Sequence, residues 1–370
     1  MKIHWYWPFA RPEELHWAEA TCSEGEELVV QVVDREAAPT GGPWGQHLRV
    51  ERNLPDVDRA AVGRAQWLAS RVRTYTERSR ARSRSWDANA PDIAHIHYLN
   101  RFTDLRWGGS RPPVLVLSVH DVMPHVLRGP RRIEKQLLRP IYNSADALIV
   151  HHELLRTRLQ DEFDIDPERL HVIGHQVFPV PEDLRSAKPP DGTPTVLFFG
   201  ALRANKGTTV LCKAIELLPP ELDVQFHFAG RGDLEVEQEL SRFAATNSST
   251  TAEIGFIEYE RKAELFRNAS IVVLPYTEFS SQSGVLHDAY GHGRPVIVTD
   301  VGALGNTIRE DETGLIVAPG DPVELSRALI RLLEDKAQSE KLSRATTRVA
   351  HERSPKKLGQ ELRMIYDSLT

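Results

Sequence analysis

Short apolar runs alternate with helix-like segments along the whole chain, and this alternation restricts the fold more than any other feature. In the first half, strand-length runs occur at Ile3–Trp7, Leu28–Val33, Leu48–Val50, Ile93–Tyr98, Val114–Val119 and Ala147–Val150. Between them, residues 56–86 and 133–143 place apolar side chains at helical spacing. Apolar runs separated by helices are typical of parallel strands that helices cover on both faces.

A proline-rich stretch from Phe178 to Pro194 interrupts this pattern and is typical of a linker. A second series follows, with strands expected at Thr195–Phe199, Val224–Ala229, Ile271–Pro275, Pro295–Thr299 and Gly314–Val317. We therefore predict an α/β fold with two Rossmann-like, doubly wound parallel-sheet domains that face a cleft. The domains are residues 1–178 and 195–352, joined by the linker 179–194. Residues 353–370 form a last helix that we expect to pack back toward the first domain.

Composition narrows the classes of partner and compartment. The chain has 370 residues, a size that favours two domains, and its net charge of −6 argues against nucleic acid as a partner. Cys22 and Cys212 lie far apart, which predicts neither a disulfide framework nor a metal site. The opening residues are too polar for an export signal, and no run is long enough to span a bilayer. We expect a cytoplasmic protein.

Basic residues gather in two segments. Residues Arg59–Arg84 contain eight arginines and one acid, and Arg128–Arg139 is also strongly basic. In the first segment, Val62, Ala65, Leu68 and Val72 follow helical spacing and predict an apolar face. Two interpretations of the basic residues stay open: a solvated helical face, or a patch for an anionic acceptor or the inner membrane surface.

The second domain opens with a strand, a loop and a helix that suit a diphosphate. Gly200 and Gly207 allow close backbone approach, and Arg203 and Lys206 lie in the loop between them. The helix after Gly207 begins with unbonded N–H groups, which favour anions. No acidic metal ligand accompanies the loop. The alternative is an ordinary turn with two exposed cations. Neither a P-loop nor a G-x-G-x-x-G pattern is present, which argues against a dehydrogenase.

These residues resemble glycosyltransferase family 4. The resemblance rests on Phe199-Gly200, Arg203 and Lys206-Gly207, and on the stretch Pro275–Asn306, and it extends more weakly into the first domain. It implies a GT-B enzyme that moves a sugar from a nucleoside diphosphate sugar to a hydroxyl of a saccharide, lipid-linked or small-molecule acceptor. The resemblance also implies retention of configuration, no metal and no other cofactor. The first domain would bind the acceptor and the second the donor.

The resemblance also assigns roles to residues of the second domain. Gly200 and the two loop cations match the family's diphosphate site. Asp288 matches the carboxylate that binds the ribose hydroxyls, and the backbone of Ser283 and Gly284 matches the turn that holds the sugar and phosphate. Ile257, after Gly255-Phe256, matches the residue whose backbone contacts the base.

The donor motif departs from the common family pattern at one position. Most members have two Glu residues there, but this chain has Asp288 in place of the second and Ser280 in place of the first. The turn Ser-Gln-Ser-Gly resembles a subgroup without the first Glu. This departure leaves the identity of the sugar open.

The first domain offers fewer candidates. His120-Asp121 follows the run Val114–Val119, so it lies where a parallel sheet binds ligands, and His120 matches the histidine that faces the reacting sugar in the family. Asp121 is a candidate acceptor residue, and it would orient this imidazole or cap the next segment. Trp5 and Trp7 either stack on an acceptor sugar or pack in the core. Two rival functions remain at this stage: a sugar-nucleotide epimerase of the same architecture, and a nucleotide-sugar-binding protein without catalysis.

Overall fold

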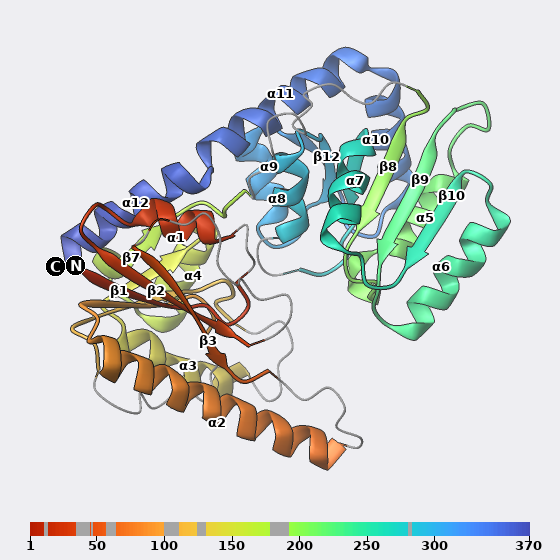
Figure 1. Cartoon of the computed structure of the whole chain (residues 1–370). Coiled ribbons are helices and arrows are strands. Elements are labelled where there is room, and N and C mark those ends of the chain that lie inside the picture. The colour runs from red at the N-terminus through yellow and green to blue at the C-terminus, as the bar shows by residue number, and fades with distance from the viewer. Residues whose placement is uncertain are drawn as a thin grey trace. The chain divides into compact units, whose positions relative to one another are not determined.

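The structure is a computed structural model, and it describes residues 1–10, 14–34, 45, 47–56, 64–99, 111–123, 131–177, 192–279 and 283–370. The chain divides into two compact units, which we describe separately (Figure 1). Unit 1 contains residues 1–174 and 355–370, and unit 2 contains residues 175–354. Most of the expected linker lies outside the described residues. In the part of the chain that the structure describes, no helix is both long and apolar enough to cross a membrane.

Unit 1 contains a seven-stranded sheet with the order β3-β2-β1-β4-β5-β6-β7, and every pairing is parallel. The strands are β1 (Lys2–Tyr6), β2 (Glu27–Val33), β3 (Leu48–Leu54), β4 (Ile93–Ile96), β5 (Val114–Ser118), β6 (Ala147–Val150) and β7 (Leu170–Val172). The order runs outward in both directions from the β1–β4 pair. Doubly wound sheets bind ligands beyond the carboxyl ends of strands at such a switch point.

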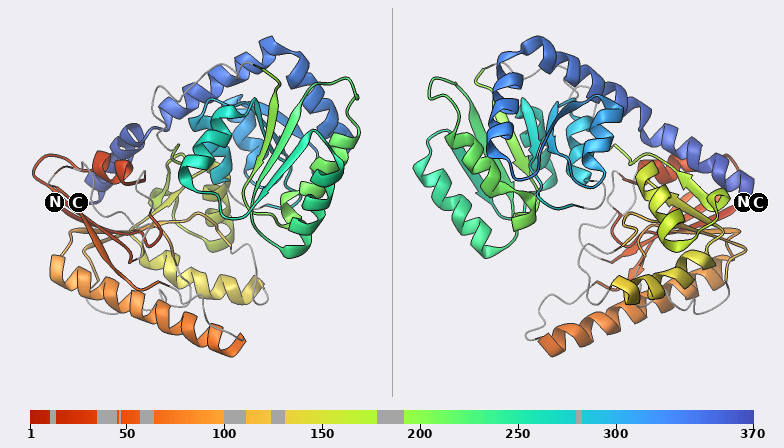
Figure 2. Two further views of the ribbon diagram at one scale, coloured as in Figure 1. Left: turned by 45° about the vertical axis from the view of Figure 1, so that its right-hand side comes forward. Right: turned by 180° about the vertical axis from the view of Figure 1, so that it is seen from behind.

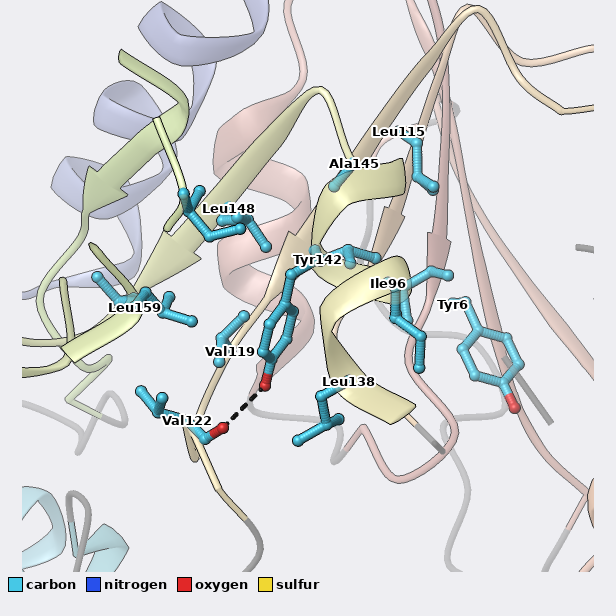
Figure 3. Packing of buried hydrophobic residues seen from close by; sticks show 14 of the residues in the cluster. Tyr6, Ile96, Leu115, Val119, Val122, Leu138, Tyr142, Ala145, Leu148 and Leu159 are labelled. Atoms are coloured by element: carbon cyan, nitrogen blue, oxygen red, sulfur yellow. Dashed lines mark hydrogen bonds between the residues drawn. The ribbon is translucent and has the colours of Figure 1, made fainter. Parts of the chain in front are cut away.

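Successive strand residues point to opposite faces of this sheet, and helices pack against both faces. One face packs against α2 (Arg64–Asn89), α3 (Arg131–Ser144) and α4 (Glu153–Phe163). Figure 3 shows Tyr142 of α3 in this layer, where its hydroxyl donates to the carbonyl of Val122 at 3.2 Å. The other face packs against α1 (Leu15–Thr21) and the last helix, α12 (Pro355–Leu369). The last helix thus belongs to the core of unit 1.

Unit 2 repeats this architecture with six parallel strands in the order β10-β9-β8-β11-β12-β13. The strands are β8 (Thr195–Phe199), β9 (Gln225–Gly230), β10 (Thr250–Ile254), β11 (Ile271–Leu274), β12 (Val296–Thr299) and β13 (Gly314–Val317). Its switch point lies between β8 and β11. The predicted pair of doubly wound parallel sheets is therefore confirmed.

Helices cover both faces of the second sheet, and Figure 2 shows them from two further sides. One face carries α5 (Thr208–Glu216), α6 (Leu234–Thr246) and α10 (Pro322–Glu334). The other carries α7 (Tyr259–Asn268), α8 (Gly284–Gly291), α9 (Leu304–Asp311) and the end of α11 (Lys336–Glu352).

The basic helix α2 differs from its sequence pattern. Leu68 and Val72, expected on a buried apolar face, are 53% and 59% exposed, so that prediction is wrong for these two residues. Arg78 and Arg82 are buried instead. Their guanidinium groups lie over aromatic rings, at 5.1 Å from Phe9 for Arg78 and 5.1 Å from Tyr6 for Arg82. Long arginine stems can bury apolar area while the head finds a π-face, which hydrophobic periodicity does not register.

Candidate functional site

The loop after β8 has a backbone conformation that depends on glycine. Gly207 ends the short 3₁₀ turn Ala204–Lys206 and adopts a φ of +70°. A Cβ atom at this position would lie 1.8 Å from the carbonyl oxygen of Pro275, which follows β11. The two loops that flank the switch point therefore touch backbone to backbone, and only glycine fits between them.

Hydrogen bonds hold this loop on both sides. The amide of Gly200 donates to Ala229 at 2.9 Å, which ties the loop to the end of β9. On the other side, the Thr277 amide donates to the Asn205 carbonyl at 3.0 Å, and Asn205 Nδ2 donates to the Glu278 carbonyl at 3.2 Å. The loop is thus a rigid support for the side chains that it carries.

Arg203 and Lys206 extend from this rigid loop. Arg203 is exposed, and Lys206 is half-buried with its Nζ at 3.6 Å from the ring centroid of Tyr276 and 4.1 Å from that of Phe279. Burial, and secondly the guanidinium of Arg203, lowers the pKa of Lys206 from 10.5 to about 8. Among the described residues, neither cation has a carboxylate in ion-pair range. Two neighbouring cations without a counter-charge suit an anion.

The N-terminus of α8 lies on the other side of the switch point. Ser283 precedes the first helical residue, Gly284, and its hydroxyl lies 3.1 Å from the hydroxyl of Tyr276. Burial raises the pKa of Tyr276 to about 12, so its hydroxyl stays protonated. A Cβ added to Gly284 would meet none of the described residues within 4 Å. The first amides of a helix have no intrahelical acceptor and favour an anion or a hydroxyl oxygen.

Asp288 lies on α8 and forms an ion pair that the sequence does not predict. Its Oδ1 accepts from Nζ of Lys262, on α7, at 2.6 Å. The two side chains are only 10% and 14% exposed. A carboxylate held in this way keeps further lone pairs that can accept hydrogen bonds from hydroxyl groups.

Ile257 follows β10, at the far edge of the same row of strand ends. It is half-buried and packs against the core, whereas Phe256 before it is 65% exposed. The guanidinium of Arg231, from the loop after β9, lies 5.2 Å above the Phe256 ring. The Gly255 amide donates to Gly230 at 2.9 Å, which joins these two loops.

In unit 1, His120 follows β5 and lies among other aromatic rings. Its Nε2 is 3.0 Å from the carbonyl oxygen of His97, and since a carbonyl can only accept, Nε2 carries the hydrogen. In a neutral ring, Nδ1 is then an acceptor. The ring stacks on Tyr98 at 4.8 Å, and Asp121 beside it is half-buried.

Trp5 and Trp7 are core residues of unit 1, with exposures of 0% and 5%. Trp5 Nε1 donates to the hydroxyl of Tyr366 at 3.0 Å, and Trp7 stacks on His97 at 4.4 Å. Both lie on the sheet face that α1 and α12 cover. Their burial supports packing, the second of the two interpretations from the sequence, and leaves no ring face for an acceptor sugar.

His95 and His97 belong to the same core. Residues two apart on a strand point the same way, and the two imidazole rings stack at 4.0 Å. Burial lowers the pKa of both imidazoles well below the usual value, so they are neutral.

Comparison with known families decides the class of the protein. Residues 30–177 match the family described as Glycosyltransferase Family 4, and residues 193–335 match the one described as Glycosyl transferases group 1. The chain belongs to glycosyltransferase family 4. The resemblance seen in the sequence is thus confirmed at the level of the family.

Individual relatives are distant from this family 4 chain. The D-inositol 3-phosphate glycosyltransferase of Xylanimonas cellulosilytica is 25% identical over 283 residues, which are 68% of this chain and 66% of that protein. The chain spans between 47% and 66% of the length of the first curated relatives that it matches.

Solved structures share the fold of this family 4 chain over its whole length. Sucrose-phosphate synthase from Thermosynechococcus elongatus has a TM-score of 0.76 at 18% identity, with 100% of this chain and 99% of that chain covered. Anabaena HepE in complex with UDP-glucose has a TM-score of 0.65 at 16% identity, with 100% of both chains covered.

The structure brings most of the predicted donor residues of this family 4 protein to one edge of the second sheet. The loop after β8 contains Gly200, Arg203 and Lys206, and the segment after β10 contains Ile257. Ser283 follows β11, and Gly284 and Asp288 lie on α8. Ser280 lies outside the described residues. Within the described ranges, no three His, Cys, Asp or Glu side chains are grouped so as to hold a metal ion.

Sequence reasoning missed three residues of this site. Lys262 pairs with a residue 26 positions away, and no local pattern indicates such a contact. Tyr276 and Phe279 lie in the segment after β11, and this position near a strand end was a usable signal, although nothing in the sequence relates the two rings to Lys206.

Proposed function

We propose that the protein transfers a sugar from a nucleoside diphosphate sugar to a hydroxyl of a saccharide, lipid-linked or small-molecule acceptor. One observation carries this proposal: Arg203 and Lys206 lie together on a rigid loop, without a counter-charge among the described residues, at the switch point of a doubly wound sheet. Membership of family 4 supports it, as does the shared fold with Anabaena HepE, which was solved with UDP-glucose.

The diphosphate, ribose and base of the donor each lie near a different set of residues at the carboxyl ends of the strands. The diphosphate lies against Arg203, Lys206 and the start of α8. The ribose hydroxyls donate to Asp288, and the base lies near Ile257. When the bond from the sugar to the diphosphate breaks, negative charge grows on the leaving phosphate. The two cations and the helix amides are already in place, so they stabilise this charge without reorganisation.

His120 has a separate role in this proposal. Its ring, which is fixed by the hydrogen bond from Nε2 to the His97 carbonyl, contacts a hydroxyl of the acceptor. The stack on Tyr98 fixes the plane of the ring. We expect His120→Ala to reduce the single-turnover rate while nucleotide affinity stays near that of the wild type. Lost nucleotide affinity with an unchanged single-turnover rate would contradict this role.

Retention and independence from metal belong to the proposal as well. The cations of the loop supply the charge that a divalent ion supplies in other transferases. Activity that EDTA removes and a divalent ion restores would refute metal independence. Product configuration, measured by NMR on the purified glycoside, tests retention directly.

The test begins with nucleotide binding and ends with transfer. Thermal shifts with UDP, GDP, ADP and dTDP identify the base, with UDP first because of the HepE complex, and the matching sugars follow with an acceptor panel. We expect Arg203→Ala or Lys206→Ala to lower kcat/KM by about 10²–10³. Lys213→Ala, an exposed lysine on the neighbouring α5, is the matched control.

Normal turnover in both loop variants would refute the assignment of the phosphate site. Two other results would refute transfer itself. Conversion of the donor sugar without any acceptor would indicate an epimerase, and nucleotide binding with neither transfer nor hydrolysis would indicate a binding protein.

The exposed side of α2 is the proposed contact with a membrane surface. Trp67, Leu68 and Val72 are exposed there, and the Arg71 guanidinium lies 4.4 Å over the Trp67 ring. Aromatic, aliphatic and cationic groups on one helix face suit the interface of an anionic bilayer. Sedimentation with phosphatidylglycerol vesicles should capture the wild type but not Leu68→Glu. Equal capture of both, or equal capture by neutral phosphatidylcholine vesicles, would contradict the contact.

A further inference from the structure

Two aromatic rings enclose the ammonium group of Lys206. Its Nζ lies 3.6 Å from the ring centroid of Tyr276 and 4.1 Å from that of Phe279. Both distances are well within the range of about 6 Å at which a cation is attracted to a π-face. The two rings themselves are 5.1 Å apart and almost perpendicular, at 71°. Among the described residues, Nζ has no carboxylate or carbonyl partner, so these rings are its main contacts. We call Tyr276 and Phe279 the ring pair.

Tyr276 of the ring pair is held in place by the same framework that holds the loop. The Tyr276 carbonyl accepts from the hydroxyl of Thr299 at 2.5 Å, and the Tyr276 hydroxyl contacts Ser283 at 3.1 Å. The residue after Tyr276 is bonded to Asn205 in the Lys206 loop. The backbone of Tyr276 is therefore fixed at the strand ends, and its hydroxyl contacts the start of α8.

We propose that Tyr276 and Phe279 are positioning residues, whose ring faces hold the Lys206 ammonium in place for the diphosphate of the donor. This inference rests on the proposed function, in which Lys206 binds that diphosphate. It assigns a role to two aromatic side chains whose presence beside Lys206 the assignment of the phosphate loop does not explain.

The physical reason is the desolvation of Lys206. A half-buried ammonium loses part of its hydration, which disfavours the charged form and leaves a flexible four-carbon chain without a fixed direction. Ring faces supply negative potential without consuming a hydrogen-bond donor of the ammonium. All three N–H groups thus stay available for phosphate oxygens, whereas a carboxylate partner would compete with the donor for the same charge.

The experiment measures nucleotide affinity by calorimetry in matched variants. Phe279→Leu keeps an apolar side chain but removes the π-face, and Phe279→Tyr restores it. We expect Phe279→Leu to weaken binding of the preferred nucleoside diphosphate by about 3- to 30-fold, the range of one cation–π contact. Phe279→Tyr should bind within about twofold of the wild type, because it keeps an aromatic ring at this position.

A double-mutant cycle separates positioning from a structural role. In a Lys206→Met background, Phe279→Leu should cause no further loss, because the ring then has no cation to hold. An equal loss in both backgrounds would overturn the inference, as would Phe279→Leu binding as tightly as the wild type or more tightly. If the wild type bound none of UDP, GDP, ADP and dTDP, the proposed function would fail first, and this inference with it. Wild-type binding that Phe279→Leu leaves unchanged would refute the inference alone. Circular dichroism and melting curves confirm that each variant is folded.

Discussion

The ion pair between Lys262 and Asp288 allows a quantitative prediction for the donor site. We expect Lys262→Met to lower the free energy of unfolding of unit 2 by about 3 kcal/mol. The substitution keeps the length and apolar stem of the side chain, so it removes little packing. It leaves the Asp288 carboxylate on α8 without its cation, in a position where it is only 10% exposed.

The magnitude follows from the geometry of the pair. At the observed N–O distance of 2.6 Å, and with an effective dielectric constant of about 20, the attraction is about 6 kcal/mol. Desolvation of both groups in the folded protein offsets part of this attraction. Removal of one partner from a buried pair typically costs about 3–5 kcal/mol. We take the lower end because both side chains retain some contact with water.

The assay is urea denaturation, supported by thermal melting. For a unit of this size, a loss of about 3 kcal/mol corresponds to a fall in Tm of about 6–12 °C. Lys262→Arg should retain most of the stability, and the double variant Lys262→Met/Asp288→Asn should recover part of it because no buried charge is left unpaired. Lys213→Met, at an exposed position of α5, is the matched control. A loss below about 0.5 kcal/mol for Lys262→Met would refute the reasoning, because it would mean that the pair behaves as an exposed one.

Three further predictions concern the phosphate loop and the last helix. Gly207→Ala should abolish nucleotide binding in a thermal-shift assay, because its Cβ would lie 1.8 Å from a carbonyl oxygen, whereas Gly320→Ala, at a similar positive φ of +77° with open space, should retain binding. Nucleotide affinity should fall as the pH rises through about 8, because Lys206 is cationic only below its lowered pKa, and Lys206→Arg should remove this alkaline loss in calorimetric titrations. Leu362→Ala should destabilise unit 1 by about 2–5 kcal/mol in urea denaturation, while Met364→Ala, at a residue that is 65% exposed, should change stability by less than about 0.5 kcal/mol.

Much of the fold could be predicted because the sheets are buried on both faces. The strands Ala147–Val150, Thr195–Phe199 and Gly314–Val317 have the bounds that their apolar runs predict, since parallel strands covered by helices are mostly apolar. The basic helix was harder to predict. Its buried face contains Arg78 and Arg82, whose burial depends on aromatic partners from other elements. The spacing of apolar residues along the helix does not predict such contacts.

The candidate site could be located from the sequence, but its internal contacts could not. Glycines and cations after a strand indicate an anion site because their roles are local to one loop. The partner of Asp288 and the rings around Lys206 come from neighbouring strand ends, and only the sheet order brings them together. The roles of the individual donor residues and of His120 stay predictions.

The return of α12 into unit 1 has a consequence for how the protein folds during synthesis. Helix α12 contributes Leu358, Leu362 and Tyr366 to the core on the sheet face that α1 and α12 cover. The same core contains Trp5, a residue of the first strand. The ribosome makes that strand first and this helix after all of unit 2, so the N-terminal unit cannot complete its core until the end of α12 has left the exit tunnel. Unit 2 has its own core within residues 175–354, and all of its helices and strands are synthesised before α12. The unit that is begun first is therefore the one that is finished last.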